Sequence, residues 1–265
     1  MIHPHTYIHP NARLATNVKI DPFTVIHQNV EIGEGTWIGS NVTIMEGARI
    51  GRNCRIFPGA VLAAIPQDRK YEGEDSIIEI GDNTTIREFV TINRGTKDRW
   101  ATKVGRNCLI MAYSHIAHDC LIGDNCIISN NTQIAGHVII GDWGWLAGMC
   151  AVHQFVQIGQ HAFISGGSLV RKDVPPYIKA ARDPLSYAGV NSVGLKRRGF
   201  TVEKINHILD IYRNIYNKGM NTSQALEYIE EEIAASDERD EIVTFIRESG
   251  RGIIKRYVKG ATDED

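Results

Sequence analysis

The chain has 265 residues, 43% of them hydrophobic, and its 29 Lys and Arg against 31 Asp and Glu give a formal net charge of −2. This near-neutral balance argues against nucleic acid as a main partner. No run of 18 apolar residues could span a membrane, and the first residues lack the basic and apolar segments of a secretory signal, so we expect a cytoplasmic protein with no membrane span.

A hydrophobic rung of Ile, Leu or Val occupies every sixth position from Ile2 to Val170, except at Asp68, Glu74 and Asp98. A helix repeats every 3.6 residues and a strand every 2, so a period of six indicates a solenoid of short strands and turns. Three hexads would form one triangular coil of 18 residues, and successive coils would stack as parallel strands about 4.8 Å apart.

Small residues accompany the rungs. Glycine often follows a rung, as at Gly33 and Gly51, where it suits a tight corner because a side chain would clash or φ would have to be positive. A second column of small residues, four positions after the rung, contains all five cysteines: Cys54, Cys108, Cys120, Cys126 and Cys150. We expect them to be buried filler, rather than metal ligands or a nucleophile, and to form no disulfide.

Two segments interrupt the rungs, at about residues 63–79 and 93–103, and are expected to leave the prism as loops. A regular prism has no pocket of its own, so loops or a neighbouring prism must form any binding site. The first loop, with Gln67, Asp68 and Lys70, is expected to be functional. The second is equally compatible with function and with a solvated insertion.

Histidines gather near the middle of the repeat. The coil of 18 residues places His118 below Gly136, and Asp119 below His137. A histidine beside a carboxylate is typical of a general base, and a glycine N–H one coil away could stabilise a developing oxyanion. Other candidates on the same three coils are His115, His153 and Gln154. The alternative for each is a corner residue that only bonds to a neighbour.

The six-residue pattern ends near Val170, and a helical period begins at Thr201. We expect one helix from Thr201 to Gly219, a second from about Thr222 and a third around 242–246. These helices would cap the open end of the solenoid, whose strand edges would otherwise be exposed.

The chain is therefore divided into a solenoid of residues 1–190 and a helical domain of residues 191–265, whose last six residues are expected to be disordered. The run Lys196–Arg198 stands at the expected start of the helical domain. Cations at a helix N-terminus oppose the helix dipole, so this run predicts a bound anion.

Several motifs together resemble the acyl-[acyl-carrier-protein]–UDP-N-acetylglucosamine O-acyltransferase family of hexapeptide-repeat enzymes. The resemblance covers nearly the whole chain and is carried by Gln67–Lys70, Ser114–Cys120, Ala135–His137, Ala151–Phe155 and Gly189–Phe200. It departs from the family pattern at Val193, where the family has a glutamate, and at Arg69, where it has an aliphatic residue.

The resemblance implies an all-β solenoid, a left-handed parallel β-helix, followed by a C-terminal α-helical domain. It further implies homotrimers with active sites between neighbouring prisms and no cofactor or metal. The implied reaction transfers a long-chain (3R)-hydroxyacyl group from acyl carrier protein to the 3-hydroxyl of UDP-N-acetylglucosamine, the first step of lipid A biosynthesis.

By the same resemblance His118 is the general base, Asp119 supports it and the Gly136 N–H forms the oxyanion hole. Residues of the first loop implied to reach the sugar and acyl groups are Gln67, Asp68 and Lys70. Those implied to line the sugar-nucleotide cleft are His115, His137, His153 and Gln154. Asn191, Arg197 and Arg198 would bind the uridine and phosphate end, which suits the guanidinium preference for phosphate oxygens. Phe163 and Gly166 would form the acyl-length ruler.

Three alternative functions fit the sequence less well. The N-acyltransferase that acts later in the same pathway carries a sizeable domain before its solenoid, whereas the rungs here begin at Ile2. A zinc carbonic anhydrase of the same fold needs a different spacing from that of His115 and His118. A non-catalytic β-helix gives no reason for gathering histidines, a carboxylate and an arginine pair beside an inserted loop.

Overall fold

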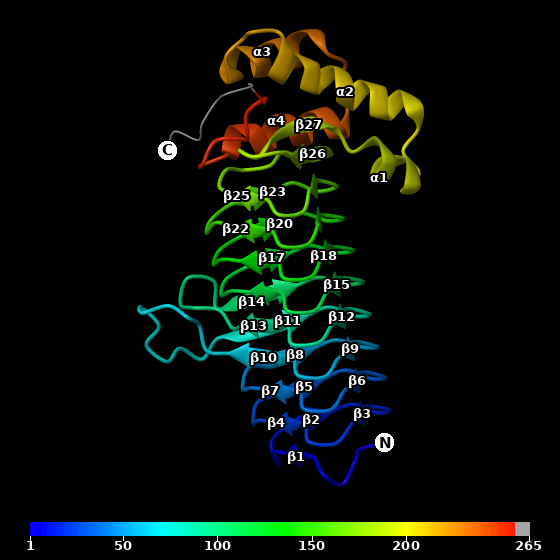
Figure 1. Ribbon diagram of the computed structural model, residues 1–265, viewed down its shortest axis with the longest axis vertical. Helices are drawn as coiled ribbons and strands as arrows, with labels where there is room; N and C mark the ends of the chain where they lie inside the picture. Colours follow the sequence, from blue (N-terminus) through cyan, green and yellow to red (C-terminus); the bar gives the residue numbers. More distant parts are fainter. Residues whose placement is uncertain (258–265) are drawn as a thin grey trace.

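The computed structural model of the chain describes residues 1–257 and shows a long prism of short strands with helices at one end (Figure 1). The last six residues, predicted to be disordered, lie outside the described part.

Three sheets form the faces of the prism, and each takes every third strand in chain order up to β25, after which β26 and β27 both join the third sheet. The first sheet contains β1 (Tyr7–Ile8), β4 (Val25–Ile26), β7 (Thr43–Ile44), β10 (Val61–Ala64), β13 (Thr91–Asn93), β16 (His115–Ile116), β19 (Gln133–Ile134), β22 (Ala151–Val152) and β25 (Leu169–Val170). The second contains β2 (Arg13–Leu14), β5 (Glu31–Ile32), β8 (Ala48–Ile50), β11 (Ile77–Ile80), β14 (Ala101–Val104), β17 (Leu121–Ile122), β20 (Ile139–Ile140) and β23 (Gln157–Ile158). The third contains β3 (Lys19–Ile20), β6 (Trp37–Ile38), β9 (Arg55–Ile56), β12 (Thr85–Ile86), β15 (Leu109–Ile110), β18 (Ile127–Ile128), β21 (Trp145–Leu146), β24 (Phe163–Ile164), β26 (Ile178–Ala181) and β27 (Ser186–Val190).

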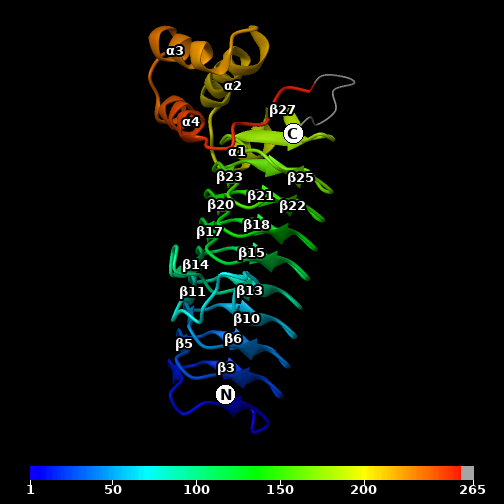
Figure 2. The ribbon, with the colours of Figure 1, turned by 90° about the vertical axis from the view of Figure 1, so that its left-hand side faces the viewer.

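The rungs stack in register through the middle of the prism, as the period of six predicts. Ile116 pairs with Ile134, 18 residues later, and both side chains are fully buried. The strands of each sheet run parallel, apart from the antiparallel pair β26 and β27 (Figure 2). At the open N-terminal end nothing covers the first rung, and Ile2 is 47% exposed. Burial against the next coil therefore holds each rung in place.

The corner glycines have one of the two expected causes. A Cβ on Gly33 would lie 2.5 Å from the carbonyl carbon of Gly51 in the next coil, so close backbone approach requires glycine there. The other expected reason, a positive φ, does not apply at Gly33, and left-handed residues lie two positions after such corners, as at Asn125 (φ 59°) and Asp119 (φ 59°). Asn and Asp tolerate that conformation better than most side chains do.

All five cysteines are buried and free, which confirms that they fill the core and form no disulfide. Each Sγ bonds to a nearby carbonyl, as Cys120 does to Ala135 O at 3.1 Å. Burial raises the pKa of the Cys120 thiol to about 12, so it stays protonated and unreactive.

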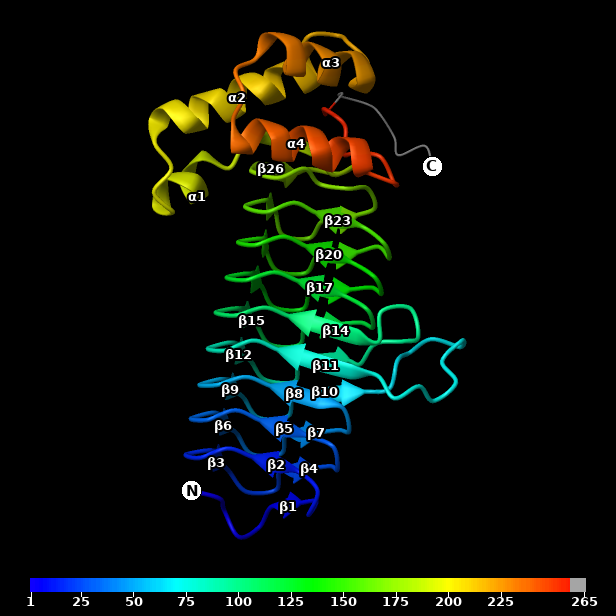
Figure 3. The ribbon, with the colours of Figure 1, turned by 180° about the vertical axis from the view of Figure 1, so that it is seen from behind.

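Both interruptions leave the prism at the edge between the first and second sheets, which we call the loop edge (Figure 3). The first connects β10 to β11 and the second connects β13 to β14. These strands extend into the segments predicted as loops, so the loops proper are shorter than expected. Residues 65–76 form the first loop and 94–100 the second.

Four helices follow the prism: α1 (Ser192–Arg197), α2 (Val202–Asn217), α3 (Thr222–Glu232) and α4 (Asp237–Glu248). The last three confirm the helices expected from the sequence, and they lie over the C-terminal end of the prism (Figure 1). The fully buried Tyr212 of α2 donates its hydroxyl to Pro176 O at 2.5 Å, which ties this cap to the last coil. Within residues 1–257 no helix combines the length and apolar character needed to cross a membrane.

Replacing Gly33 by Ala should lower the free energy of unfolding by about 1–3 kcal/mol, because the new methyl group meets backbone that cannot move without shifting a coil. Urea denaturation measures this loss. Gly148→Ala is the matched control, since its Cβ would approach only Asn130 O, at 3.3 Å. Equal losses in the two variants would contradict the close-approach explanation.

Candidate active site

His118 and Asp119 form a hydrogen-bonded pair at the loop edge, in the turn between β16 and β17. The Nδ1 atom of His118 lies 2.8 Å from Oδ2 of Asp119. The His118 side chain is 13% exposed and that of Asp119 is fully buried. The imidazole is therefore fixed on one side by a carboxylate and keeps a small opening to solvent.

The Asp119 carboxylate accepts four hydrogen bonds. Oδ1 accepts from the backbone N–H groups of Thr96 (3.0 Å) and Arg99 (3.2 Å), and Oδ2 from the Thr96 hydroxyl (2.7 Å) and His118. Burial by itself would raise the pKa of Asp119, but the bonds from His118 and Thr96 outweigh it and lower the pKa to about 2. The carboxylate is thus ionised throughout the range in which imidazole titrates.

Gly136 lies directly against the His118 ring, one coil further along, as the 18-residue stacking predicts. A Cβ at this glycine would come within 2.6 Å of Cε1 and 2.7 Å of Nε2 of His118. The neighbouring amides of Ala135 and His137 donate to Val152 O and His118 O. Within residues 1–257 the Gly136 N–H has no hydrogen-bond acceptor.

His137 is the second imidazole of the site. Its ring is perpendicular to that of His118, with centroids 5.1 Å apart, and stacks on Phe155 at 4.4 Å. Its Nδ1 lies 3.0 Å from Asp98 Oδ2, in ion-pair range but without hydrogen-bond alignment, and its Nε2 lies 3.8 Å from Asp119 Oδ2. Burial lowers the pKa of His137, which favours the neutral ring.

The remaining histidine candidates flank this pair. His115 on β16 bonds through Nδ1 to the Thr91 hydroxyl at 2.7 Å, and burial lowers its pKa. His153 and Gln154 are exposed on the coil beyond His137. The loop edge thus brings together His115, His118 and His137 with Asp119 and Gly136.

Within residues 1–257 no hydrogen bond or ion pair joins the predicted contacts of the first loop to His118. Asp68 accepts from the backbone N–H of Lys70 at 3.0 Å, and Gln67 is exposed. The loop is anchored instead to the second one, through the hydroxyl of Tyr71 and Nη2 of Arg94, 2.6 Å apart.

The predicted nucleotide residues lie at a different edge, between the second and third sheets, which we call the arginine edge. Figure 1 shows α1 on the side of the prism opposite the loops. The Arg198 guanidinium lies 5.0 Å from the Trp143 ring centroid and 3.3 Å from His161 Nδ1. Burial, with the charge of Arg198, lowers the pKa of His161 to about 4, so this ring is neutral and can accept from Arg198.

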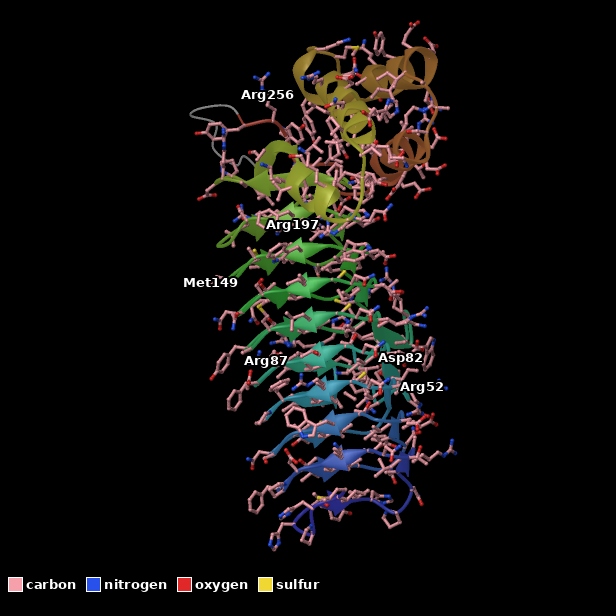
Figure 4. All side chains as sticks on the ribbon, turned by 90° about the vertical axis from the view of Figure 1, so that its right-hand side faces the viewer. Arg52, Asp82, Arg87, Met149, Arg197 and Arg256 are labelled. Atoms are coloured by element: carbon pink, nitrogen blue, oxygen red, sulfur yellow. The ribbon has the colours of Figure 1, made fainter. Side chains whose placement is uncertain are left out.

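The Asn191 side chain is held by hydrogen bonds, whereas the Arg197 side chain is exposed. The buried Asn191 amide donates to His161 O at 2.9 Å and accepts from Gly194 N as the N-cap of α1. Arg197 is exposed near the helical end of the prism (Figure 4). The expectation that this basic run begins a helix was wrong, because Lys196 and Arg197 occupy the last turn of α1. There they favour the helix dipole, so the dipole argument for a bound anion fails.

The two ruler candidates are found near the third edge, between the third and first sheets. Phe163 on β24 packs edge-on against Trp145, with centroids 5.3 Å apart. Gly166 is exposed in the turn after β24, where a Cβ would lie 3.1 Å from Gly148 O. The candidate residues therefore divide among all three edges of one prism.

Sequence reasoning left the role of the second loop open and did not predict that Thr96 and Arg99 hold the Asp119 carboxylate or that Asp98 lies beside His137. The only signal in the sequence was the interruption of the rung at position 98. It locates an insertion but does not say where the backbone N–H groups of that insertion point.

His118, Asp119 and His137 also offer ligand atoms that lie within 4.8 Å of one another, a cluster that could hold a metal ion. Both Asp119 oxygens already accept two hydrogen bonds each, and Nδ1 of His118 faces one of them. A cation would have to displace these donors, so the arrangement fits an Asp–His pair better than a metal centre.

Comparisons with known proteins show which family the chain belongs to. Residues 173–254 match the family described as UDP N-acetylglucosamine O-acyltransferase, domain 2, and residues 29–64 and 101–136 match the six-repeat bacterial transferase hexapeptide family. Over 255 residues the chain is 43% identical to an acyl-[acyl-carrier-protein]–UDP-N-acetylglucosamine O-acyltransferase of Thiobacillus denitrificans, covering 96% of this chain and 99% of that relative. The chain belongs to the UDP-N-acetylglucosamine O-acyltransferase family.

Solved structures extend the match. The UDP-N-acetylglucosamine acyltransferase of Bacteroides fragilis superposes with a TM-score of 0.95 at 51% identity, covering 96% of this chain and all of that one (100%). The Francisella novicida enzyme gives 0.94 at 42% identity, covering 100% of this chain and 97% of that one. The chain is thus an acyltransferase, and its prism is a left-handed parallel β-helix followed by helices, as the motifs predicted.

The ionised Asp119 should stabilise the fold in a pH-dependent way. Because its folded pKa of about 2 is below the ordinary value of 3.8, the stabilisation is complete above about pH 5 and is lost as pH falls through 2. At 1.36 kcal/mol per unit the full effect is about 2 kcal/mol. Urea denaturation of wild type and Asp119→Asn should therefore show a stability difference that narrows from pH 6 to pH 2.5. A stability difference between the two proteins that does not change with pH would contradict the low pKa of Asp119.

Proposed function

We propose that the chain transfers a (3R)-hydroxyacyl group from acyl carrier protein to the 3-hydroxyl of UDP-N-acetylglucosamine, the first step of lipid A biosynthesis, with His118 as general base. The observation that carries this proposal is the His118 imidazole held between the Asp119 carboxylate and the backbone of Gly136. The names of the relatives support the donor and the acceptor.

The bond to Asp119 assigns the two ring nitrogens different tasks. With the carboxylate ionised, Nδ1 carries the proton and donates a hydrogen bond to Oδ2. The Nε2 lone pair is then free to accept a proton. When Nε2 takes the sugar proton, the adjacent carboxylate stabilises the imidazolium. A base positioned in this way contributes about 10²–10⁴-fold to the rate.

The Gly136 amide is suited to the second task, stabilising the oxyanion. Its nitrogen belongs to the residue that packs against Cε1 and Nε2 of His118, so it lies beside the atom that removes the proton. Donors fixed before the reaction stabilise a developing charge without reorganisation.

In the proposed reaction His118 Nε2 removes the 3-hydroxyl proton as the sugar oxygen attacks the thioester carbonyl carbon. The carbonyl oxygen becomes an oxyanion opposite the Gly136 N–H. Collapse breaks the carbon–sulfur bond, and the leaving thiolate of the carrier protein takes the proton from His118. The products are the O-acylated sugar nucleotide and a free thiol, and the base returns to its starting state.

Placement of the candidates on three edges supports a site shared between chains. The loop edge holds the base, while Arg197 and Arg198 lie at the arginine edge of the same prism. A homotrimer would bring one chain's arginine edge or first loop to its neighbour's loop edge. We therefore propose that Gln67, Asp68 and Lys70 bind substrate in such a shared cleft.

Arg197 and Arg198 have different roles in the proposed phosphate contact. Arg198 is engaged with Trp143 and His161, so it shapes the site, whereas Arg197 is exposed and can bind a phosphate directly. Asn191 would contribute through the turn that it caps, because its amide is occupied at both ends.

His118→Ala should reduce transfer to UDP-N-acetylglucosamine by about 10²–10⁴-fold, since only solvent can then take the sugar proton. The measurement is O-acylation from a panel of hydroxyacyl carrier proteins of different chain length. His27→Ala, a histidine remote from the site in the second coil, is the matched control and should keep full activity. Transfer by wild type that survives in His118→Ala would remove His118 from the mechanism.

Gly166→Met should shift donor preference towards shorter acyl chains, because the exposed Gly166 leaves space that a bulky side chain would fill. The same carrier-protein panel gives the ratio of kcat/KM for long and short donors. Gly166→Ala should give a smaller shift in the same direction. An unchanged ratio in the methionine variant would place the ruler elsewhere.

A further inference from the structure

The second loop surrounds Asp119 with donors. Of the four hydrogen bonds to its carboxylate, two come from Thr96 and one from the Arg99 amide. Arg99 also donates from Nη1 to Asp119 O at 2.8 Å, and the Asp119 N–H donates to the Thr102 hydroxyl at 2.8 Å. The segment from Thr96 to Thr102 thus contacts the backbone and the side chain of one residue.

These contacts compensate two unfavourable features of Asp119. Asp119 has a left-handed backbone (φ 59°) and a fully buried carboxylate, two features that are unfavourable unless other groups compensate them. The pair of donors on Oδ1 fixes that oxygen and so turns Oδ2 towards His118. Without them the carboxylate could rotate away from the imidazole.

Thr96 has the most direct connection to the imidazole. Its hydroxyl donates to Oδ2, the same oxygen that binds His118 Nδ1, at 2.7 Å against 2.8 Å. The hydroxyl itself is oriented by a further contact, since it accepts from the Asp98 amide at 3.2 Å.

We infer that Thr96 is a positioning residue for the acyl transfer: its amide and hydroxyl hold the Asp119 carboxylate in the orientation that binds His118. The second loop is then part of the catalytic apparatus and not a solvated insertion. This inference rests on the proposed function, because it assigns a role in that reaction.

Thr96→Val in the full chain removes the hydroxyl and keeps the shape. We expect kcat for transfer from hydroxyacyl carrier protein to fall about 10- to 100-fold, the range for a hydrogen bond to a charged group, with KM for UDP-N-acetylglucosamine nearly unchanged. The carboxylate would then be held less firmly against His118 and would stabilise the imidazolium less, so the acid limb of kcat should move to lower pH. Thr96→Ser should restore both the rate and the limb.

Other charged or titratable groups face the pair and must be the same in every variant. They are His137 and Asp98 from the corner and the second loop, His115 from β16, and Arg99. The matched control is Thr84→Val, a buried threonine whose hydroxyl donates to Gly105 O and accepts from Cys108 N, away from the loop edge. It should leave the acid limb where it is in wild type.

The possible outcomes distinguish a failure of the positioning role of Thr96 from a failure of the proposed function. A Thr96→Val enzyme with unchanged kcat and acid limb, beside an inactive His118→Ala, overturns the positioning role and leaves the proposed function intact. A wild-type chain that transfers no hydroxyacyl group overturns the proposed function itself. If the valine variant does not fold, Thr96→Ala against Thr96→Ser makes the same comparison, and equal kcat values in that pair overturn the inference.

Discussion

The stacking of coils in an 18-residue register is the constraint on which the rest of this structure depends. Because every rung must bury itself on the next, residues that differ by 18 meet at one corner, as His118 and Gly136 do, and Asp119 and His137. A slip in the register would expose the rungs and also separate His118 from the Gly136 backbone beside it. The hydrophobic core thus sets the geometry of the site, although none of its side chains takes part in the chemistry.

The same constraint shows where the chain can be lengthened. Across the two loops the spacing of paired rungs grows to 30 residues for Leu62 and Ile92 and to 24 for Ile92 and Ile116, and both values remain multiples of six. The insertions therefore add side chains and amides at the loop edge without disturbing the core. One of them supplies what a bare corner lacks, donors that turn a buried, left-handed aspartate into a rigid partner for an imidazole.

The sequence predicted those parts of the fold and the site that follow from the repeat period. The rungs located the sheets, and their spacing of 18 placed His118 beside Gly136, because burial enforces that register. It could not supply the contacts of Thr96 and Arg99, since a loop has no period and its amides can point anywhere. The six-residue α1 was too short for a helical pattern to show where it begins and ends, so Lys196 was assigned to the start of a helix and not to its last turn. The proposed cooperation between edges would involve neighbouring chains, which the pattern of one chain does not describe.

The central claim is that an ionised Asp119 fixes the tautomer of His118. The most direct test is the ¹⁵N chemical shift of the two His118 ring nitrogens in the full chain at pH 8, assigned by comparison with His118→Ala. The account predicts a protonated Nδ1 that donates to Asp119 and an unprotonated Nε2 ready to accept the sugar proton. A ring protonated at Nε2 would contradict it, because that nitrogen could not act as the base.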